Sequence, residues 1–115
     1  MKMIIAIIRP DKFEAVQAAL VAHQIYLMTV SDVRGCGTQK GFAEQFRGNK
    51  IGLIRLLPKV KLEIAVSTDV VQAVVDAIAR AANTGKIGDG KVFITDLEAA
   101  LRIRTGERDA SAITG

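Results

Sequence analysis

The fold class is decided by the stretch KVKLEIAVS, residues 59–67. Every second side chain in it is apolar: Val60, Leu62, Ile64 and Val66. The side chains between them are Lys59, Lys61, Glu63 and Ala65. Successive side chains of a strand point to opposite faces, so this period of two predicts a β-strand with one buried face.

A helix is predicted directly after this strand. Thr68 and Asp69 are residue types that commonly cap a helix start, and residues 70–82 follow with apolar side chains at helical spacing. The apolar face consists of Val70, Val71, Val74, Val75, Ile78 and Ala82. Residues 91–97, KVFITDL, then predict another strand.

The N-terminal part of the chain shows the same order. Residues 3–8 are an isoleucine-rich run that ends before Pro10, as suits a buried strand. Asp11 offers an N-cap for a helix that extends to about residue 23. Its apolar face consists of Phe13, Val16, Ala19, Leu20 and Ala22. Residues 25–35, IYLMTVSDVRG, predict a second strand.

Between the two halves, residues 36–55 show no sustained period and contain several glycines. A loop of this length inside a compact domain is uncommon and is usually functional or disordered. The order of elements is therefore that of the ferredoxin-like α+β fold, βαββαβ, with an antiparallel sheet and both helices on one face. The other face also carries apolar residues, so we expect self-association through it. Residues 1–115 are interpreted as a single domain.

The composition narrows the classes of function. The net charge is +4, but the basic residues are scattered and aromatic residues make up only 4%, which argues against a nucleic-acid partner. The single cysteine and single histidine, Cys36 and His23, exclude an intramolecular disulfide and most zinc sites. Cys36 is interpreted as a small buried thiol, and no nucleophile–base pair favours an enzyme. The N-terminal apolar run is too short to span a membrane, so we expect a cytoplasmic protein without direct membrane insertion.

The stretch TGKIGDGK, residues 84–91, has the spacing of a Walker A loop. A P-loop follows a strand, opens a helix and places Ser or Thr after its lysine. Here a predicted helix precedes the stretch, a predicted strand follows it, and Val92 comes after the lysine. The Walker interpretation therefore fails. The residues alone leave two alternatives: a plain turn after a helix C-cap at Gly85, or a concave anion site of open glycine amides and an ammonium.

The same stretch and RIRTGE, residues 102–107, resemble the two signature segments of the PII nitrogen-regulatory signal-transduction family. Further segments look like that family in the same order: IIRPDK (7–12), MTVSDVRG (28–35), QKG (39–41), RG (47–48) and LPKVKLEIAV (57–66). The resemblance covers nearly the whole chain. It implies a homotrimer of ferredoxin-like subunits that acts as a sensor and not as an enzyme, with slow ATP hydrolysis left open.

The resemblance implies that ATP or ADP binds in clefts between subunits. The residues expected to wrap the phosphates are Gly88, Asp89, Gly90 and Lys91. Arg102 and Arg104 would reach the phosphates from the neighbouring subunit, with an extended backbone placing both guanidinium groups on one side; from composition alone they are solvated surface charges. The remaining nucleotide-binding positions are Thr29, Gly35, Gly37, Thr38, Gln39, Glu63 and Ala65.

The resemblance also implies 2-oxoglutarate bound beside ATP through Mg²⁺. Gln39 stands at the position of the Mg²⁺ ligand, and Lys59 stands where a lysine pairs with the carboxylate of the keto acid. The full set expected around 2-oxoglutarate is Gln39, Lys40, Gly41, Lys59 and Gly88. The plainer alternatives are an exposed strand charge for Lys59 and a solvated loop residue for Gln39.

The resemblance names residues 37–56, approximately, as the T-loop, and residues 102–115, approximately, as the C-terminal segment. The T-loop would contact a target such as an ammonium transporter, or another membrane transporter or enzyme, and recruit the protein to the inner face of the membrane. This loop departs from the family pattern. Thr38 stands where the family has an arginine that supports the phosphates, which leaves the preference for ATP or ADP open. The only tyrosine is Tyr26, outside the loop, so nucleotidylylation of the loop is not expected.

The end of the loop leaves a further alternative. Its apolar side chains are Ile51, Leu53, Ile54 and Leu56. They either extend the following strand or form a surface for a partner. Two functional hypotheses result. The first is a trimeric sensor of adenylate and 2-oxoglutarate that regulates nitrogen assimilation. The second is a divergent sensor of ATP and ADP alone, without a 2-oxoglutarate response, that regulates a different transporter or enzyme.

Overall fold

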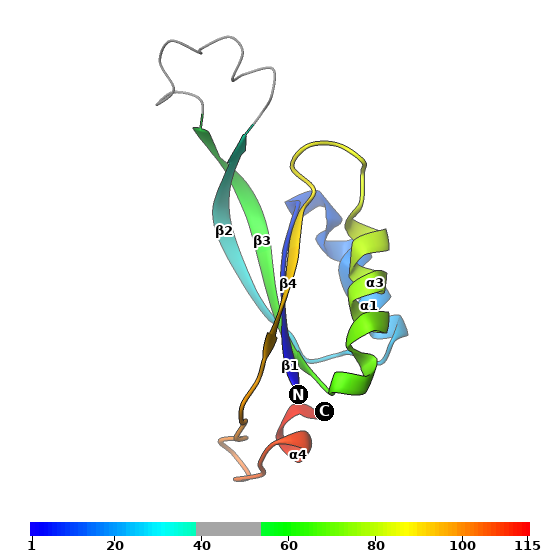
Figure 1. The fold of residues 1–115 in the computed structure, drawn as a ribbon, viewed down its shortest axis with the longest axis vertical. Helices are drawn as coiled ribbons and strands as arrows, with labels where there is room; N and C mark the ends of the chain where they lie inside the picture. Colours follow the sequence, from blue (N-terminus) through cyan, green and yellow to red (C-terminus); the bar gives the residue numbers. More distant parts are fainter. Residues whose placement is uncertain (39–53) are drawn as a thin grey trace.

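The computed structural model describes residues 1–38 and 54–115. The strands are β1 (Lys2–Ile8), β2 (Thr29–Thr38), β3 (Ile54–Val66) and β4 (Gly90–Asp96). They form one antiparallel sheet in the order β2-β3-β1-β4. The helices α1 (Phe13–Ala22) and α3 (Val71–Ala82) lie side by side against one face of this sheet (Figure 1). The predicted α+β, ferredoxin-like arrangement is confirmed.

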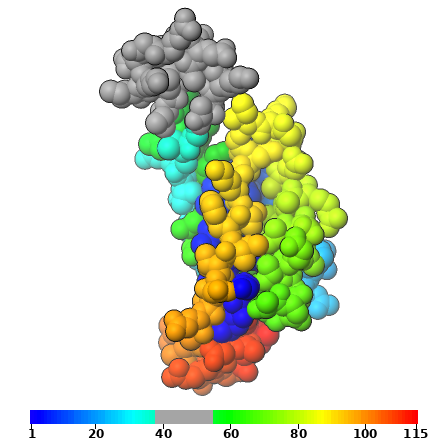
Figure 2. Space-filling view, in the orientation of Figure 1, coloured from blue at the N-terminus to red at the C-terminus, as the bar shows by residue number. Residues whose placement is uncertain are grey.

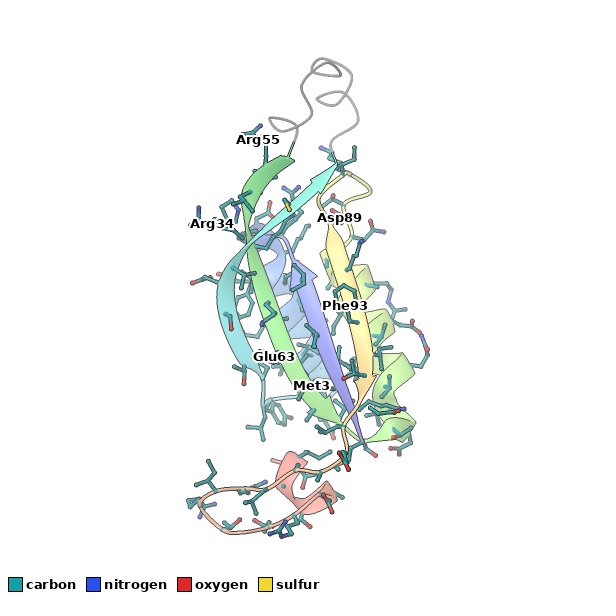
Figure 3. The ribbon with its side chains drawn as sticks, turned by 60° about the vertical axis from the view of Figure 1, so that its left-hand side comes forward. Met3, Arg34, Arg55, Glu63, Asp89 and Phe93 are labelled. Carbon is teal, nitrogen blue, oxygen red and sulfur yellow. The ribbon has the colours of Figure 1, made fainter. Side chains whose placement is uncertain are left out.

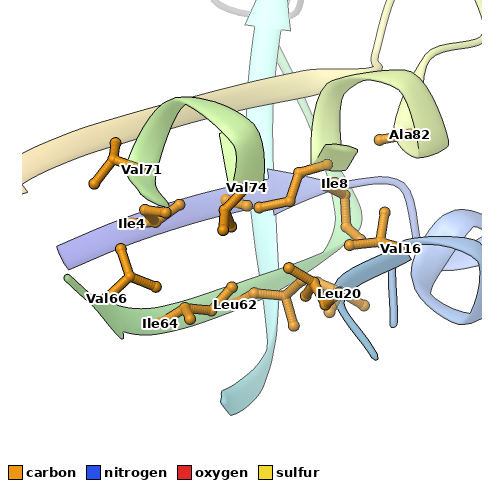
Figure 4. Close-up of a cluster of buried hydrophobic side chains, with 13 residues drawn as sticks. Ile4, Ile8, Val16, Leu20, Leu62, Ile64, Val66, Val71, Val74 and Ala82 are labelled. Carbon is orange, nitrogen blue, oxygen red and sulfur yellow. The ribbon is translucent and has the colours of Figure 1, made fainter. Parts of the chain in front are cut away.

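The core lies between the two helices and the central strands β1 and β3 (Figure 4). The predicted inward side of residues 59–67 is confirmed, because Val60, Leu62, Ile64 and Val66 are all buried. On β1 the buried positions are Ile4, Ala6 and Ile8, which share the helix-facing side through their pairing with β3. Val16 and Leu20 of α1, with Val74 and Ile78 of α3, close the core from the other side.

Leu62 tests this core most directly, because none of its side chain is exposed. We expect Leu62→Ala to lower the free energy of unfolding by about 2–5 kcal/mol, since it removes buried methyl groups and leaves a cavity. Leu56→Ala on the same strand is the matched control: that side chain is 60% exposed, so its loss should cost less than about 1 kcal/mol. Urea denaturation followed by circular dichroism measures both, and equal effects would contradict this picture of the core.

Both helix starts differ from the prediction in the same way. Each helix is preceded by a 3₁₀ turn, η1 (Pro10–Lys12) before α1 and η3 (Thr68–Val70) before α3. The Asp11 carboxylate does not cap α1; it accepts two hydrogen bonds from the Arg9 guanidinium, each 3.0 Å long. The Asp69 carboxylate likewise accepts from the Ser67 hydroxyl. The predicted side-chain caps are wrong because each short turn supplies backbone bonds at the helix start.

Two strands, β2 and β3, begin several residues away from their predicted starts. β2 starts at Thr29, because the chain turns at Gln24 (φ 62°) and passes through residues 25–28 without joining the sheet. β3 starts at Ile54 and runs through Pro58, so the strand-extension alternative holds from Ile54 onward. At Pro58 the strand pairs with β2 and lies beyond the end of β1. Proline is tolerated there because only one side of the strand needs ladder bonds.

No helix of residues 1–38 or 54–115 lies over the sheet face away from α1 and α3 (Figure 3). Pairing places apolar residues of β1 and β4 together on this face, with Phe93 opposite Ile5. Phe93 is 50% exposed and Met3, Ile5 and Ile7 are half-buried. Within the described residues this face is therefore apolar along β1 and at Phe93 of β4, whereas Lys61 and Glu63 make it charged along β3.

The chain ends in a separate small unit below the sheet. The backbone turns back on itself and pairs at Leu101 and Arg108, and the short helix α4 (Ala110–Ile113) follows. Figure 2 shows this unit at one end of the molecule and the loop of residues 84–90 toward the other end. β4 separates the two along the sheet (Figure 1). No helix in the described ranges is long and apolar enough to cross a membrane.

Candidate functional site

A cavity of about 450 Å³ lies where the loop of residues 84–90 meets the sheet. Its glycines are Gly35, Gly37, Gly88 and Gly90. Its basic side chains come from Arg55, Lys59, Lys86 and Lys91. Its apolar wall is formed by Ile7, Leu57, Ile87 and Phe93, and Cys36 and Asp89 complete the lining. Glycines have no side chain, so their backbone N–H groups stay accessible. Together with the basic side chains they suit an anionic ligand.

Asp89 closes the glycine loop on itself. Its carboxylate accepts hydrogen bonds from the backbone amides of Thr84 and Gly85, at 2.8 and 3.0 Å, and from the Thr84 hydroxyl. The negative charge of the Asp89 carboxylate is therefore stabilised by donors of the same loop. In this structure the Asp89 carboxylate holds the loop, and its expected role in wrapping phosphates stays a prediction.

These bonds also change the acidity of Asp89. The Thr84 hydroxyl bond, followed by the Thr84 amide bond, lowers the pKa of the Asp89 carboxyl below its ordinary value; partial burial opposes this shift, and the Gly85 amide and the Arg9 charge add to it. A carboxyl whose pKa is lowered by folding stabilises the fold above its unfolded pKa. That stabilisation is lost as the pH falls through the lower, folded value.

We therefore expect the loop of residues 84–90 to stay intact above the ordinary aspartate pKa of about 4, and to loosen only as the pH falls further, through the lowered pKa of Asp89. The amide resonances of Thr84 and Gly85 in an NMR titration report this directly. Asp89→Asn, which removes the charge, should show the loosened resonances already at neutral pH. Amide resonances that stay unchanged across the acid range would contradict the role assigned to Asp89.

Gly90 brings β4 unusually close to β1. Its φ of +96° lies in a region that side chains avoid, and a Cβ placed there would lie 1.7 Å from the carbonyl oxygen of Ile7. Only glycine allows this approach. The contact places the end of the loop directly on the β1 backbone and so positions the neighbouring Lys91 beside the cavity.

Lys59 links the opposite wall to the loop. It lies on β3, and its ammonium donates a hydrogen bond to the carbonyl of Gly88. Gly35, on the adjoining strand, leaves space for this side chain, since a Cβ there would lie 3.3 Å from Lys59 Cγ. Lys59 is half-buried, so it is not the solvated strand charge that one alternative described.

The charges around the cavity are strongly unbalanced. Four basic side chains line it, while its one carboxylate, Asp89, is occupied by the loop. Within residues 1–38 and 54–115, none of these four cations forms an ion pair. The described ranges also contain no cluster of His, Cys, Asp or Glu side chains that could hold a metal ion. The excess of basic side chains thus suits the cavity to an anion.

The structure brings together only part of the predicted site. The predicted residues that line the cavity are Gly35, Gly37, Lys59, Gly88, Asp89, Gly90 and Lys91. Gln39, Lys40 and Gly41 lie outside the described residues, as does most of the predicted T-loop, and Thr38 is the last residue of β2. Cys36 is exposed and lines the cavity, so its interpretation as a buried thiol is wrong. Cys36 pairs with Leu56, beyond the end of the β1–β3 pairing at Val60, and no helix of the described residues covers the sheet there.

The other predicted residues lie away from this cavity. Thr29 and Glu63 are opposite each other on β2 and β3, and Ala65 is opposite Met3 on β1. Figure 3 shows Glu63 and Met3 farther along the sheet than Asp89 of the glycine loop, and strand pairing places Thr29 and Ala65 beside them. The segment of Arg102 and Arg104 lies beyond the end of the sheet that is remote from the glycine loop (Figure 1). The expected extended spacing is wrong, because residues 103–105 form a turn and Gly106 N–H bonds to the carbonyl of Arg102 at 2.8 Å.

Sequence reasoning missed several residues of the cavity. The apolar wall of Ile7, Leu57 and Phe93 comes from three strands and has no local signature. Strand pairing explains it: Ile7 is opposite Lys91, and Leu57 is opposite Gly35. Arg55 was visible only as a scattered basic residue, whereas Lys86 lies in the stretch TGKIGDGK, whose glycines and lysines already indicated a candidate anion site. These apolar residues could have been predicted only from the register in which the strands pair.

Comparison with known proteins places this geometry in context. The family model described as nitrogen regulatory protein P-II matches residues 1–107. The chain is 48% identical over 113 residues to nitrogen regulatory protein P-II of Rhizobium etli, covering 98% of this chain and 100% of that one. It is 51% identical to nitrogen regulatory protein P-II 1 and 46% identical to nitrogen regulatory protein GlnK, both of Escherichia coli strain K12, each over 113 residues and with the same coverage.

A similar solved structure is that of Arabidopsis thaliana PII bound to citrate. Its TM-score is 0.77 and its sequence is 39% identical, with 96% of this chain and 90% of that chain covered.

Proposed function

Since the chain belongs to the family of nitrogen regulatory proteins P-II, we propose that it is a sensor of ATP and ADP whose binding site is shared between two copies of the chain. The family members carry the names of regulatory proteins, in keeping with a role in regulation and not in catalysis. The proposal is supported by one observation above all. A cavity lined by cations lies at one end of the sheet, and a second set of candidate ligand residues lies at the other end.

The first half of the proposed site binds the phosphates. Gly88 and Gly90 have φ values of +104° and +96°, a backbone arrangement in which successive amides can converge on an anion. Lys91 supplies an exposed ammonium next to them. Charge-assisted bonds of this kind are stronger than neutral ones, so this end of the sheet is assigned to the triphosphate or diphosphate.

The second half comes from a neighbouring subunit. Thr29, Glu63 and Ala65 would contact the base and ribose, and Arg102 and Arg104 would reach the phosphates from the far side. Within one chain the length of β4 separates these residues from the glycine loop, so one chain cannot complete the site. A closed homotrimer would bring the unlike ends of adjacent subunits together. It would also cover the apolar sheet face around Ile5 and Phe93.

We extend the proposal to 2-oxoglutarate bound with Mg²⁺ beside ATP. Lys59 and the backbone of Gly88 would meet its carboxylate, together with Lys40 and Gly41. Mg²⁺ prefers oxygen ligands, and the amide oxygen of Gln39 would join oxygens of the nucleotide and the keto acid. When bound, the ion would neutralise charge between the two anions. The citrate in the Arabidopsis relative is also a carboxylate anion, which supports this part of the proposal.

The regulated target is proposed to be an ammonium transporter, or another membrane transporter or enzyme, contacted through residues 37–56. Recruitment to the inner face of the membrane would follow from such a target. The second candidate, an adenylate sensor without a 2-oxoglutarate response, is motivated by the departure of residues 37–56 from the pattern that the family resemblance implies, of which Thr38 is one instance. Calorimetry decides between them: 2-oxoglutarate binding that requires Mg-ATP supports the first, and no 2-oxoglutarate signal at saturating Mg-ATP supports the second.

A mixing experiment tests the shared site itself. Lys91→Gln damages the phosphate half and Arg104→Gln damages the other half. Each variant alone should therefore bind ATP weakly. After unfolding and refolding of an equal mixture, mixed oligomers should regain tight sites that combine an intact loop from one chain with an intact arginine from the other. If mixing restores no binding while native mass spectrometry shows mixed trimers, the site is not shared between subunits.

A further inference from the structure

The C-terminal segment, residues 110–115, is attached to the chain through Arg102. The Arg102 Nη2 atom donates hydrogen bonds to the backbone carbonyls of Ser111 at 3.1 Å and Ala112 at 3.4 Å, and also to that of Thr114. Its Nε atom lies 3.8 Å from a carboxylate oxygen of Glu107. The guanidinium thus sits at the C-terminal end of α4, where carbonyl groups lack helical partners and a cation is favoured.

The geometry of a guanidinium limits what else Arg102 can bind. A bidentate contact with phosphate uses two parallel N–H bonds from neighbouring nitrogens. The two edges that offer such a pair are Nε with Nη2, and Nη1 with Nη2. Both edges include Nη2, whose two hydrogens are here shared among three carbonyls. A bidentate phosphate contact therefore requires Arg102 to release the C-terminal carbonyls.

The junction before α4 is strained. Asp109 has φ 55° and ψ −123°, a conformation that residues other than glycine rarely adopt. It is held there from both sides. Its amide bonds to the carbonyl of Ala100 at 2.9 Å, and its own carbonyl accepts from Ala112 and Ile113 at 2.8 and 3.2 Å. Undocking of α4 would relax this strain, which lowers the cost of releasing the segment.

Arg104 provides the contrast within the same turn. It is exposed, and it makes no side-chain hydrogen bond or ion pair within residues 1–38 and 54–115. The two arginines were predicted to act alike toward phosphate. In this fold only Arg102 is engaged by the chain's own C-terminus.

We propose that the C-terminal segment is an autoinhibitory strap that competes with the phosphates of the nucleotide for Arg102. Nucleotide binding withdraws the guanidinium from the carbonyls, and residues 110–115 undock. The state of the chain's end therefore reports whether the nucleotide site is filled. This inference rests on the proposed role of Arg102 in binding phosphate from the neighbouring subunit.

The test compares the full chain with a chain that ends at Asp109. Without the strap, Arg102 no longer has to break its bonds with the segment, so calorimetry should show ATP binding about three- to tenfold tighter. Ala112→Pro, which removes an N–H bond of α4, should act in the same direction. Hydrogen exchange of residues 110–115 in the full chain should become faster when ATP is saturating. Arg104→Gln should weaken ATP binding while leaving exchange of the segment in the nucleotide-free protein unchanged.

The outcomes separate this proposal from the proposed function. If ATP binds the full and shortened chains equally well, or binds the shortened chain more weakly, the strap is overturned while the nucleotide site stands. The strap is likewise overturned if the hydrogen-exchange rate of residues 110–115 is the same with and without saturating ATP. If neither chain binds ATP although both form the same oligomer in sedimentation, the proposed function and the strap fail together.

Discussion

Gly90→Ala is expected to lower the free energy of unfolding by about 3 kcal/mol or more. A Cβ at this position would lie 1.7 Å from the carbonyl oxygen of Ile7, 2.8 Å from its carbonyl carbon and 3.3 Å from Ile8 Cα. These are backbone atoms of the central strand, so they cannot move aside as a flexible side chain would. β4 would have to separate from β1 at the end next to the glycine loop.

Urea and thermal denaturation at one protein concentration measure this effect, and the melting temperature should fall by roughly 10 °C or more. Gly85→Ala is the matched control. Gly85 also has a positive φ, +77°, but no atom lies within 4 Å of the added methyl group. We expect a cost of only about 1–2 kcal/mol there, from the backbone conformation alone. Equal losses from the two substitutions would show that the contact with Ile7 is not the cause.

Lys91→Gln is expected to weaken ATP binding by about 10- to 100-fold, because one charge-assisted bond to phosphate contributes roughly 1.5–3 kcal/mol. The fold should not change. Lys91 is exposed and lies at the edge strand β4, opposite Ile7, and it forms no ion pair in the described part of the chain. Calorimetry with ATP measures the loss, and circular dichroism confirms that the protein is folded.

Arg80→Gln is the control for charge alone. Arg80 is an exposed cation on α3 that does not line the cavity, so its loss lowers the net charge equally and should change the ATP affinity by less than about twofold. If Lys91→Gln binds ATP as tightly as the unaltered chain does, the glycine loop is not the phosphate site. If both variants lose affinity equally, the cations act through general attraction and not through a contact.

Residues 25–28 illustrate where local reasoning fails. Their apolar and β-branched character predicted part of a strand, but Gln24 turns the chain and the sheet begins only at Thr29. Ile25 and Met28 pack against the core from outside the sheet. An apolar segment can be buried without being a strand, and only the packing of neighbouring elements distinguishes the two cases.

For the glycine stretch, residues 84–91, local reasoning was more informative. The inverted order of helix and strand around residues 84–91 was enough to exclude a P-loop, and the structure has α3 before the stretch and β4 after it. Its glycines and lysines also indicated a candidate anion site. The bonds from Asp89 to Thr84 and Gly85, and the contact of Gly90 with β1, could not be derived from local pattern, because they depend on the exact path of the loop.

The sequence by itself determined the fold class and the buried side of each central strand. Both follow from periodicity, which is local: the alternation that includes Leu62 and Ile64 requires one buried face wherever the strand is placed. The tertiary structure alone decided which residues share a site. Strand register joins Ile7, Leu57 and Phe93 to the glycine loop, while the length of β4 keeps Arg102 and Arg104 at the other end. Register and distance arise from pairing between segments far apart in the chain, and a local pattern carries no information about them.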